Sequence, residues 1–272
     1  MSEYEHWIGR RSVRTETISE RQLQLFRTTF HGLLAPSEVP IGFHWTFVPD
    51  LYPAADLGRD GHPRTGLVLP ALPLPRRMWA GGELEFVSPF SSSDTVIRET
   101  TIADIAFKEG SSGRLGFVTV NHVYSAGGVV RLRERQDVVY REDAKPGARP
   151  PAPAAEHWNV IAQRPFVTDS TLLFRYSALT FNGHRIHYDE PYARNVEGYA
   201  GLVVHGPMQA LLMLNLAIEF LGHVPVRFSY RGVSPLIAGV PTVIEARNGD
   251  NEIELRVRTN DGMATMTGRA MP

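Results

Sequence analysis

The chain has 272 residues, enough for two domains of about 100 to 150 residues each. Its 28 Lys and Arg residues balance 29 Asp and Glu residues, so the charge indicates no nucleic-acid partner. The absence of Cys excludes disulfides and thiolate chemistry. The first residues, "MSEYEHWIGRRSVRTE", lack the apolar core of a signal peptide, and we therefore expect a cytoplasmic protein.

The first half begins with a predicted helix and continues as strands. "SERQLQLFRTTF" has a helical pattern with Ser19 in the capping position. "ELEFVSPF", "DTVIRETTIADIAFKEG", "RLGFVTVNHVYSAGG" and "VVRLRERQDVVYRE" then follow, rich in β-branched and aromatic residues and separated by turns. Four prolines and five alanines in "DAKPGARPPAPAAEH" predict a linker over residues 143–157, which would separate domains at 1–142 and 158–272.

The second half repeats this rhythm. "PMQALLMLNLAIEFLG" predicts a helix, and strand-like runs such as "PTVIEARNGD" and "EIELRVRTNDG" follow it. "FVSPF" around Pro89 and "GVSPL" around Pro235 each end one strand and precede a polar strand pair. The halves therefore resemble diverged copies, each with a helix and an antiparallel meander, which predicts an α+β fold.

An uncharged stretch over residues 198–218 approaches the length of a membrane span. Only the part after Pro207 can form a regular helix, and Gln209 and Asn215 interrupt its apolar run. We therefore expect a buried helix of a globular protein and no membrane partner.

A polar cluster stands out in "LTFNGHRIHYDEP", where Asn182, His184 and His187 lie close together. Three histidines, the two here and His205, could in principle ligate zinc. The chain has neither Cys nor an HExxH helix, so we expect no metal. Imidazole titrates near neutrality, which makes a histidine in such a cluster a candidate for proton transfer.

These residues carry a family resemblance. "LFRYSALTFNGHRIHYDEPYA" followed by "EGYAGLVVHGPMQALL" resembles the hydratase segment of MaoC-like double-hotdog proteins. "WIGR", "PRRMWAGGELEF" and "ERQDVVYRE" resemble the branch containing itaconyl-CoA and mesaconyl-CoA hydratases and mitochondrial-type hydroxyacyl-thioester dehydratases. The resemblance implies an α+β double hotdog, in which two curved antiparallel sheets each wrap a central helix. It also implies reversible hydration and dehydration of a short enoyl-CoA, with the carboxylated itaconyl-CoA and mesaconyl-CoA among the candidates, and no cofactor.

The resemblance assigns catalytic roles within the second half. His187 aligns with the family's proton-transferring histidine, and Gly206 with the glycine whose N–H holds the thioester oxygen. Asn182 stands where the family usually has an aspartate, so it would hold the water by hydrogen bonds. Either His187 performs both proton transfers, or a carboxylate such as Asp189 or one from the first half shares the work.

In this interpretation the first half supplies the acyl and CoA pocket and has lost the catalytic motif. The expected substrate-binding residues include His184, which shapes the catalytic loop, and Trp79, which covers adenine or the pantetheine arm. Arg76 and Arg77 are candidates for phosphate contacts. Arg185 is a candidate clamp for a free substrate carboxylate.

Two other functions stay open. One is a 3-hydroxyacyl-thioester dehydratase of fatty-acid metabolism that takes longer chains on CoA or acyl carrier protein. The other is a noncatalytic thioester-binding protein that lost turnover through Asn182. A fused pair of hotdogs can form a site alone, so a monomer is allowed, although we expect a homodimer.

Overall fold

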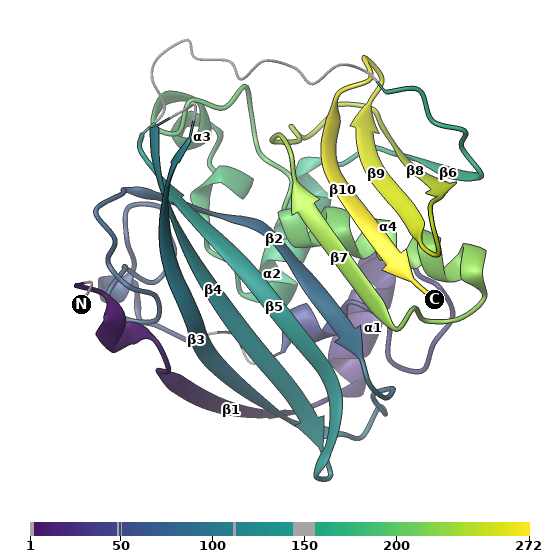
Figure 1. Ribbon diagram of the computed structural model, residues 1–272, viewed down its shortest axis with the longest axis horizontal. Helices are drawn as coiled ribbons and strands as arrows, with labels where there is room; N and C mark the ends of the chain where they lie inside the picture. Colours follow the sequence, from purple (N-terminus) through teal and green to yellow (C-terminus); the bar gives the residue numbers. More distant parts are fainter. Residues whose placement is uncertain (1–2, 48, 50, 111–112, 144–155) are drawn as a thin grey trace.

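A computed structural model of the protein describes residues 3–47, 49, 51–110, 113–143 and 156–272. Within these residues ten strands form one antiparallel sheet, in the order β1-β3-β4-β5-β2-β7-β10-β9-β8-β6 (Figure 1). The strands are β1 (Arg11–Thr17), β2 (Arg76–Phe86), β3 (Thr95–Gly110), β4 (Gly113–Ala126), β5 (Val129–Arg141), β6 (Ala162–Phe166), β7 (Arg227–Gly232), β8 (Thr242–Asn248), β9 (Ile253–Thr259) and β10 (Ala264–Met271).

The helices lie mostly on one face of this sheet (Figure 1). The α-helices are α1 (Glu20–Thr29), α2 (Ser170–Thr180), α3 (Glu190–Asn195) and α4 (Gly206–Leu221). Short 3-10 helices are η1 (Glu5–Trp7), η2 (Phe43–Thr46), η3 (Ala54–Asp56) and η4 (Arg185–His187).

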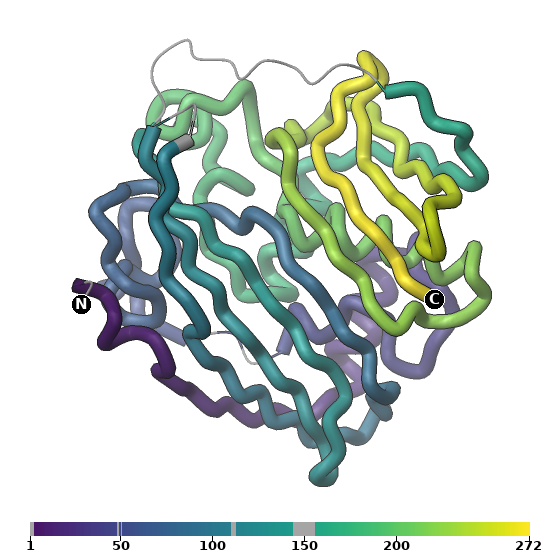
Figure 2. Tube along the Cα trace, in the orientation of Figure 1, coloured from purple at the N-terminus to yellow at the C-terminus, as the bar shows by residue number. Residues whose placement is uncertain are grey.

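The predicted internal repeat is confirmed by the order of the strands. From its outer edge to the centre, the first half runs β1-β3-β4-β5-β2, and the second half runs β6-β8-β9-β10-β7. Pro89 and Pro235 each follow the strand of their half that lies at the centre. The trace in Figure 2 shows that β1 and β6 end up at opposite edges of the sheet. Each half is thus a five-stranded copy of the same unit.

The two halves are joined through an antiparallel pair of β2 and β7. This junction depends on Gly81 of β2, because a Cβ on Gly81 would lie 2.5 Å from the Tyr230 carbonyl oxygen. A Cβ on Gly82 would lie 2.4 Å from the Arg135 carbonyl oxygen, on the other side of the strand. The expected pair of curved sheets is therefore present as two halves of one continuous sheet.

The predicted division of the chain falls between the two halves, since β5 ends at Arg141 and β6 begins at Ala162. Most of the predicted linker, residues 144–155, lies outside the described residues. The domains 1–142 and 158–272 stay a prediction.

Helix α4 confirms the expected buried helix after Pro207, and every residue from Met208 to Ile218 is buried. Its polar residues are used inside the protein. Asn215 accepts a hydrogen bond from the Ala35 N–H at 2.9 Å and donates to the Leu211 carbonyl. In the described part of the chain, no helix is long and apolar enough to cross a membrane. The polar interruptions therefore tie α4 to neighbouring segments.

Helix α1 confirms the predicted capping by Ser19, whose side chain accepts from the Gln22 N–H while Gln22 reaches back to the cap. Helices α2 and α3 were not predicted from the sequence. Asp169 caps α2 through the Leu172 N–H at 2.7 Å. The loop with the polar cluster thus begins at the end of a capped helix.

Candidate active site

The loop after α2 positions the polar cluster through a left-handed residue and a short turn. Phe181 ends α2 with a φ of 50°. The Asn182 N–H donates to the Ser177 carbonyl at 2.8 Å, and the Asn182 side-chain oxygen accepts from the His184 N–H at 2.9 Å. The Asn182 side-chain oxygen is therefore engaged in shaping the loop, which leaves the NH2 group of that side chain available as a donor. Its role toward water stays a prediction.

His187 lies in η4 and is buried, with 6% of its surface exposed. Its Nδ1 lies 2.7 Å from the Val203 carbonyl oxygen. A carbonyl oxygen can only accept, so Nδ1 carries the hydrogen and Nε2 keeps a free lone pair. Burial, aided by His184, holds the pKa of His187 well below its usual value of 6.5. His187 is therefore a neutral imidazole whose Nε2 carries the free lone pair.

His205 packs flat against His187, with ring centroids 3.5 Å apart and an angle of 19° between the planes. The His205 Nε2 lies 2.8 Å from the Ser177 hydroxyl. The pKa of His205 is well below 6.5, mainly because the ring is buried and also because His187 is next to it. His205 is also the residue before α4, so the stack places His187 at the start of that helix.

Gly206 is the first residue of α4 and precedes Pro207. The first N–H groups of an α-helix have no partner within the helix and lie at the positive end of its dipole. Among the described residues, no backbone oxygen accepts a hydrogen bond from the Gly206 N–H. The structure thus brings Gly206 next to the His187 and His205 stack, where an N–H donor could hold an oxyanion.

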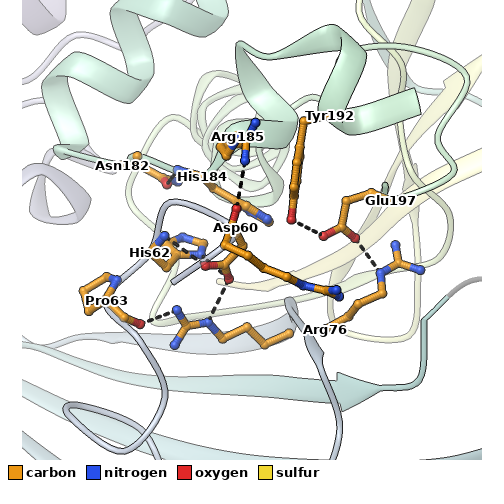
Figure 3. Close-up of polar contacts among 12 residues, drawn as sticks. Asp60, His62, Pro63, Arg76, Asn182, His184, Arg185, Tyr192 and Glu197 are labelled. Carbon is orange, nitrogen blue, oxygen red and sulfur yellow. Dashed lines mark hydrogen bonds and ion pairs between the residues drawn. The ribbon is translucent and has the colours of Figure 1, made fainter. Parts of the chain in front are cut away.

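Sequence reasoning missed two residues of the first half that meet the catalytic loop. Asp60 and His62 lie beside His184 (Figure 3), and Arg77, which was expected to contact a phosphate, pairs with Asp60. The His62 and His184 rings are 4.4 Å apart at 41°, and the Asp60 carbonyl accepts from the Arg185 N–H at 2.9 Å. The one local signal was the turn "GRDGHPR", whose glycines and proline suit a tight loop.

Asp60 is an ionised carboxylate held between two cationic or polar groups. Its Oδ2 lies 3.3 Å from Arg77 Nε and 3.4 Å from His62 Nδ1. Burial raises its pKa, but His62, Arg77 and His184 together lower it well below its usual range. His184 itself has a pKa well below 6.5, because of burial and then the neighbouring His62.

Asp60, His62 and His184 form the one group in the described ranges whose potential metal-binding atoms all lie within 4.8 Å of one another. Two of the three histidines that were considered as zinc ligands from the sequence are engaged elsewhere. His187 Nδ1 contacts the Val203 carbonyl oxygen, and His205 Nε2 contacts the Ser177 hydroxyl. The Arg77 guanidinium competes for Asp60. This arrangement suits an ion-paired carboxylate better than a cation ligand.

The other expected substrate-binding residues lie around this cluster but are engaged within the protein. Arg76 is 7% exposed and its Nε lies 2.5 Å from Glu197, which also accepts from the Tyr192 hydroxyl (Figure 3). Arg185 pairs with Asp189 at 2.7 Å. Arg76 therefore has no free guanidinium for a phosphate. Asp189 is the ion-pair partner of Arg185.

Trp79 lies on β2 and donates through Nε1 to the Gly81 carbonyl at 2.9 Å. Its ring meets Trp45 edge-on and lies near Tyr230. These aromatic rings come from both halves and belong to or pack against the main hydrophobic core, so Trp79 lies among aromatic side chains that could pack against an acyl or pantetheine chain.

Comparison with known proteins identifies the family. Residues 42–238 match the family model "Hydroxyacyl-thioester dehydratase type 2". The chain is 39% identical over 268 residues to mesaconyl-C(4)-CoA hydratase of Chloroflexus aurantiacus, covering 96% of this chain and 95% of that protein.

Solved structures show the same fold at low sequence identity. HtdX of Mycobacterium tuberculosis superposes with a TM-score of 0.67 at 17% identity, over 96% of this chain and 99% of that one. A double-hotdog protein, also from Mycobacterium tuberculosis, gives a TM-score of 0.54 at 15% identity, over 97% and 95% of the two chains. The chain therefore belongs to the hydroxyacyl-thioester dehydratase type 2 family and has the double-hotdog fold.

Proposed function

We propose that this chain, a hydro-lyase by its family, catalyses the reversible addition of water to a short enoyl-CoA that carries a free carboxylate, of the itaconyl-CoA or mesaconyl-CoA type. The full-length similarity to a mesaconyl-C(4)-CoA hydratase supports this substrate class. The observation that carries the chemistry is the buried, neutral His187, whose Nε2 is left free by the Nδ1 contact with Val203.

The reaction needs a base for water and a donor for the thioester oxygen. In hydration, His187 Nε2 removes a proton from water as the water oxygen bonds to C3 of the substrate. The π electrons move toward C1, and negative charge develops on the thioester oxygen. The Gly206 N–H, at the positive end of α4, is placed to stabilise that charge. A proton then adds to C2 and His187 releases the proton that it took from water, so the 3-hydroxyacyl thioester forms with no net gain or loss of protons.

The surroundings of the cluster favour a short and polar acyl group. His62, His184, Asp60 and Arg77 form one side of the cluster beside His187. A long alkyl chain gains free energy only by burial against apolar surface, which these side chains do not offer. A carboxylated acyl group tolerates such polar neighbours, because its charge can be paired or hydrogen-bonded there.

The test is an absorbance assay of enoyl-thioester loss with mesaconyl-CoA, itaconyl-CoA, crotonyl-CoA and a long-chain trans-2-enoyl-CoA. We expect kcat/KM for a carboxylated substrate to exceed that for crotonyl-CoA by at least about tenfold, the equivalent of about 1.4 kcal/mol. A preference for the long-chain substrate would support the dehydratase of fatty-acid metabolism. No turnover of any of the four would support the noncatalytic binding protein and refute the proposal.

A further inference from the structure

A compact turn of the first half presents Asp60 and His62 to the catalytic loop. The Gly58 N–H donates to the His62 carbonyl at 2.7 Å, and Leu57 and Pro63 form an isolated bridge. The turn touches the catalytic loop backbone to backbone, because a Cβ on Gly61 would lie 2.0 Å from the Gly183 carbonyl oxygen. Gly61 also has a φ of +83°. The position of His62 is thus set by two loops packed without side chains between them.

Asp60 orients His62 from this turn. Its Oδ1 accepts from the His62 N–H at 3.1 Å, and its Oδ2 lies 3.4 Å from His62 Nδ1 and 3.3 Å from Arg77 Nε. Both carboxylate oxygens therefore have partners, and Nδ1 of His62 is buried against Asp60. Contacts of this kind are often long in an unliganded enzyme and shorten in the complex. The Nε2 atom of His62 is the nitrogen left for another partner.

His62 differs from the other histidines of the cluster in its contact with solvent. Its side chain is 30% exposed, whereas His184, His187 and His205 are buried. The rings form a series, since His187 lies 5.4 Å from His184 and His184 lies 4.4 Å from His62. A proton that leaves or enters this buried cluster therefore has His62 as its outlet to water.

We propose that His62, positioned by Asp60, is the second proton-transfer group of the site and supplies what the amide of Asn182 cannot. This inference rests on the proposed hydration. As His187 Nε2 takes a proton from the attacking water, His62 Nε2–H gives a proton to C2, and the enolate electrons form the new C–H bond. His187 then releases its proton and His62 regains one, so the cycle consumes one water and no net proton. Dehydration runs the same steps in reverse.

The test compares His62→Ala and His62→Gln with the control His31→Ala, which removes an exposed histidine outside the cluster. We expect kcat of both His62 variants to fall by about a hundredfold or more, with KM within about threefold, whereas the control keeps its rate. Added imidazole should restore part of the rate of His62→Ala and none of the rate of His187→Ala. In D2O, the exchange of the C2 proton of the product, followed by NMR, should slow in parallel with kcat.

Asp60→Asn tests the positioning role separately. We expect a smaller loss of kcat, about tenfold, and an alkaline limb of the kcat/KM profile moved to lower pH, because an amide stabilises a protonated imidazole less than a carboxylate does. The charged or titratable groups that face His62 are Asp60, Arg77 and His184, with His187 and His205 farther away. A purely structural role would lower the melting temperature without moving the pH profile.

Three results would overturn the inference. If the wild type is active and His62→Ala keeps more than half of the wild-type rate, the role of His62 is refuted while the proposed function stands. Loss of wild-type activity after EDTA, restored by Zn2+, would show that Asp60, His62 and His184 bind a metal instead. A wild type without hydratase activity on any of the four substrates would refute the proposed function and the inference together.

Discussion

Replacing Asn182 by Ala should loosen the catalytic loop, because the Asn182 side-chain oxygen accepts from the His184 N–H at 2.9 Å. His184 is buried, so this N–H would lose its partner without gaining water. Leaving a buried donor unpaired costs about 1 to 3 kcal/mol. For a chain of this size that corresponds to a fall in melting temperature of roughly 2 to 12 °C. The same displacement should reduce kcat by roughly ten- to a hundredfold.

Asn182→Asp separates the loop contact from the chemistry. A carboxylate keeps the acceptor for the His184 N–H, so the melting temperature should stay near that of the wild type. The new negative charge favours the protonated forms of His184 and His187 and raises their pKa values. A base must be neutral to act, so the acid limb of kcat/KM should move to higher pH.

The assays are differential scanning fluorimetry and the enoyl-thioester absorbance assay between pH 5 and 9. The reasoning fails if Asn182→Ala melts at the wild-type temperature, since the contact with His184 would then contribute nothing. It also fails if Asn182→Asp leaves the pH profile unchanged, because residue 182 would then lie off the reaction path.

Four further outcomes are expected. His187→Ala should lower kcat by about a hundred- to ten-thousandfold while acyl-CoA binding, measured by calorimetry, stays nearly intact; a variant with more than a tenth of the wild-type rate would exclude His187 as the base. An alanine at position 206 has room for its side chain, because the Cβ would lie 3.7 Å from Met266 Cε. Gly206→Ala should therefore leave the melting temperature nearly unchanged and lower kcat by more than it raises KM. Equal changes in kcat and KM would indicate that the alanine blocks the substrate pocket. Gly82→Val should destabilise the protein by several kcal/mol in urea unfolding, because its Cβ would clash with the Arg135 carbonyl at 2.4 Å; a wild-type midpoint would contradict the close approach of β5 to Gly82. Burial lowers the pKa of His187 in the folded protein, whereas in the unfolded chain this histidine binds a proton near pH 6.5. The melting temperature should therefore fall as the pH drops below about 6.5. A melting temperature that does not change with pH would contradict the burial of His187.

Local sequence patterns determined the elements and the catalytic segment. Strand-like runs and turn residues predicted the repeated meander, and Ser19 predicted the start of α1. The apolar run after Pro207 predicted α4, whose first turn carries Gly206. These inferences succeeded because periodicity and capping depend on neighbours within a few residues. Helix α2 was missed because its apolar and polar residues are not separated onto two faces, so the sequence shows no clear helical periodicity there. Its one local signal is the capping residue Asp169.

The tertiary structure alone decided which distant side chains complete the site and which are withdrawn from it. Arg76 appeared available for phosphate, but it pairs with Glu197, 121 residues away, and is buried. Asp60 and His62 carried no motif, yet they meet His184 because Gly61 and Gly183 let two loops approach at backbone distance. Such meetings depend on how β2 and β7 join the halves and on the shape of the loops they carry. No local periodicity encodes these contacts between distant side chains. The free energy that fixes them comes from residues far apart in the sequence, which meet only as the chain folds.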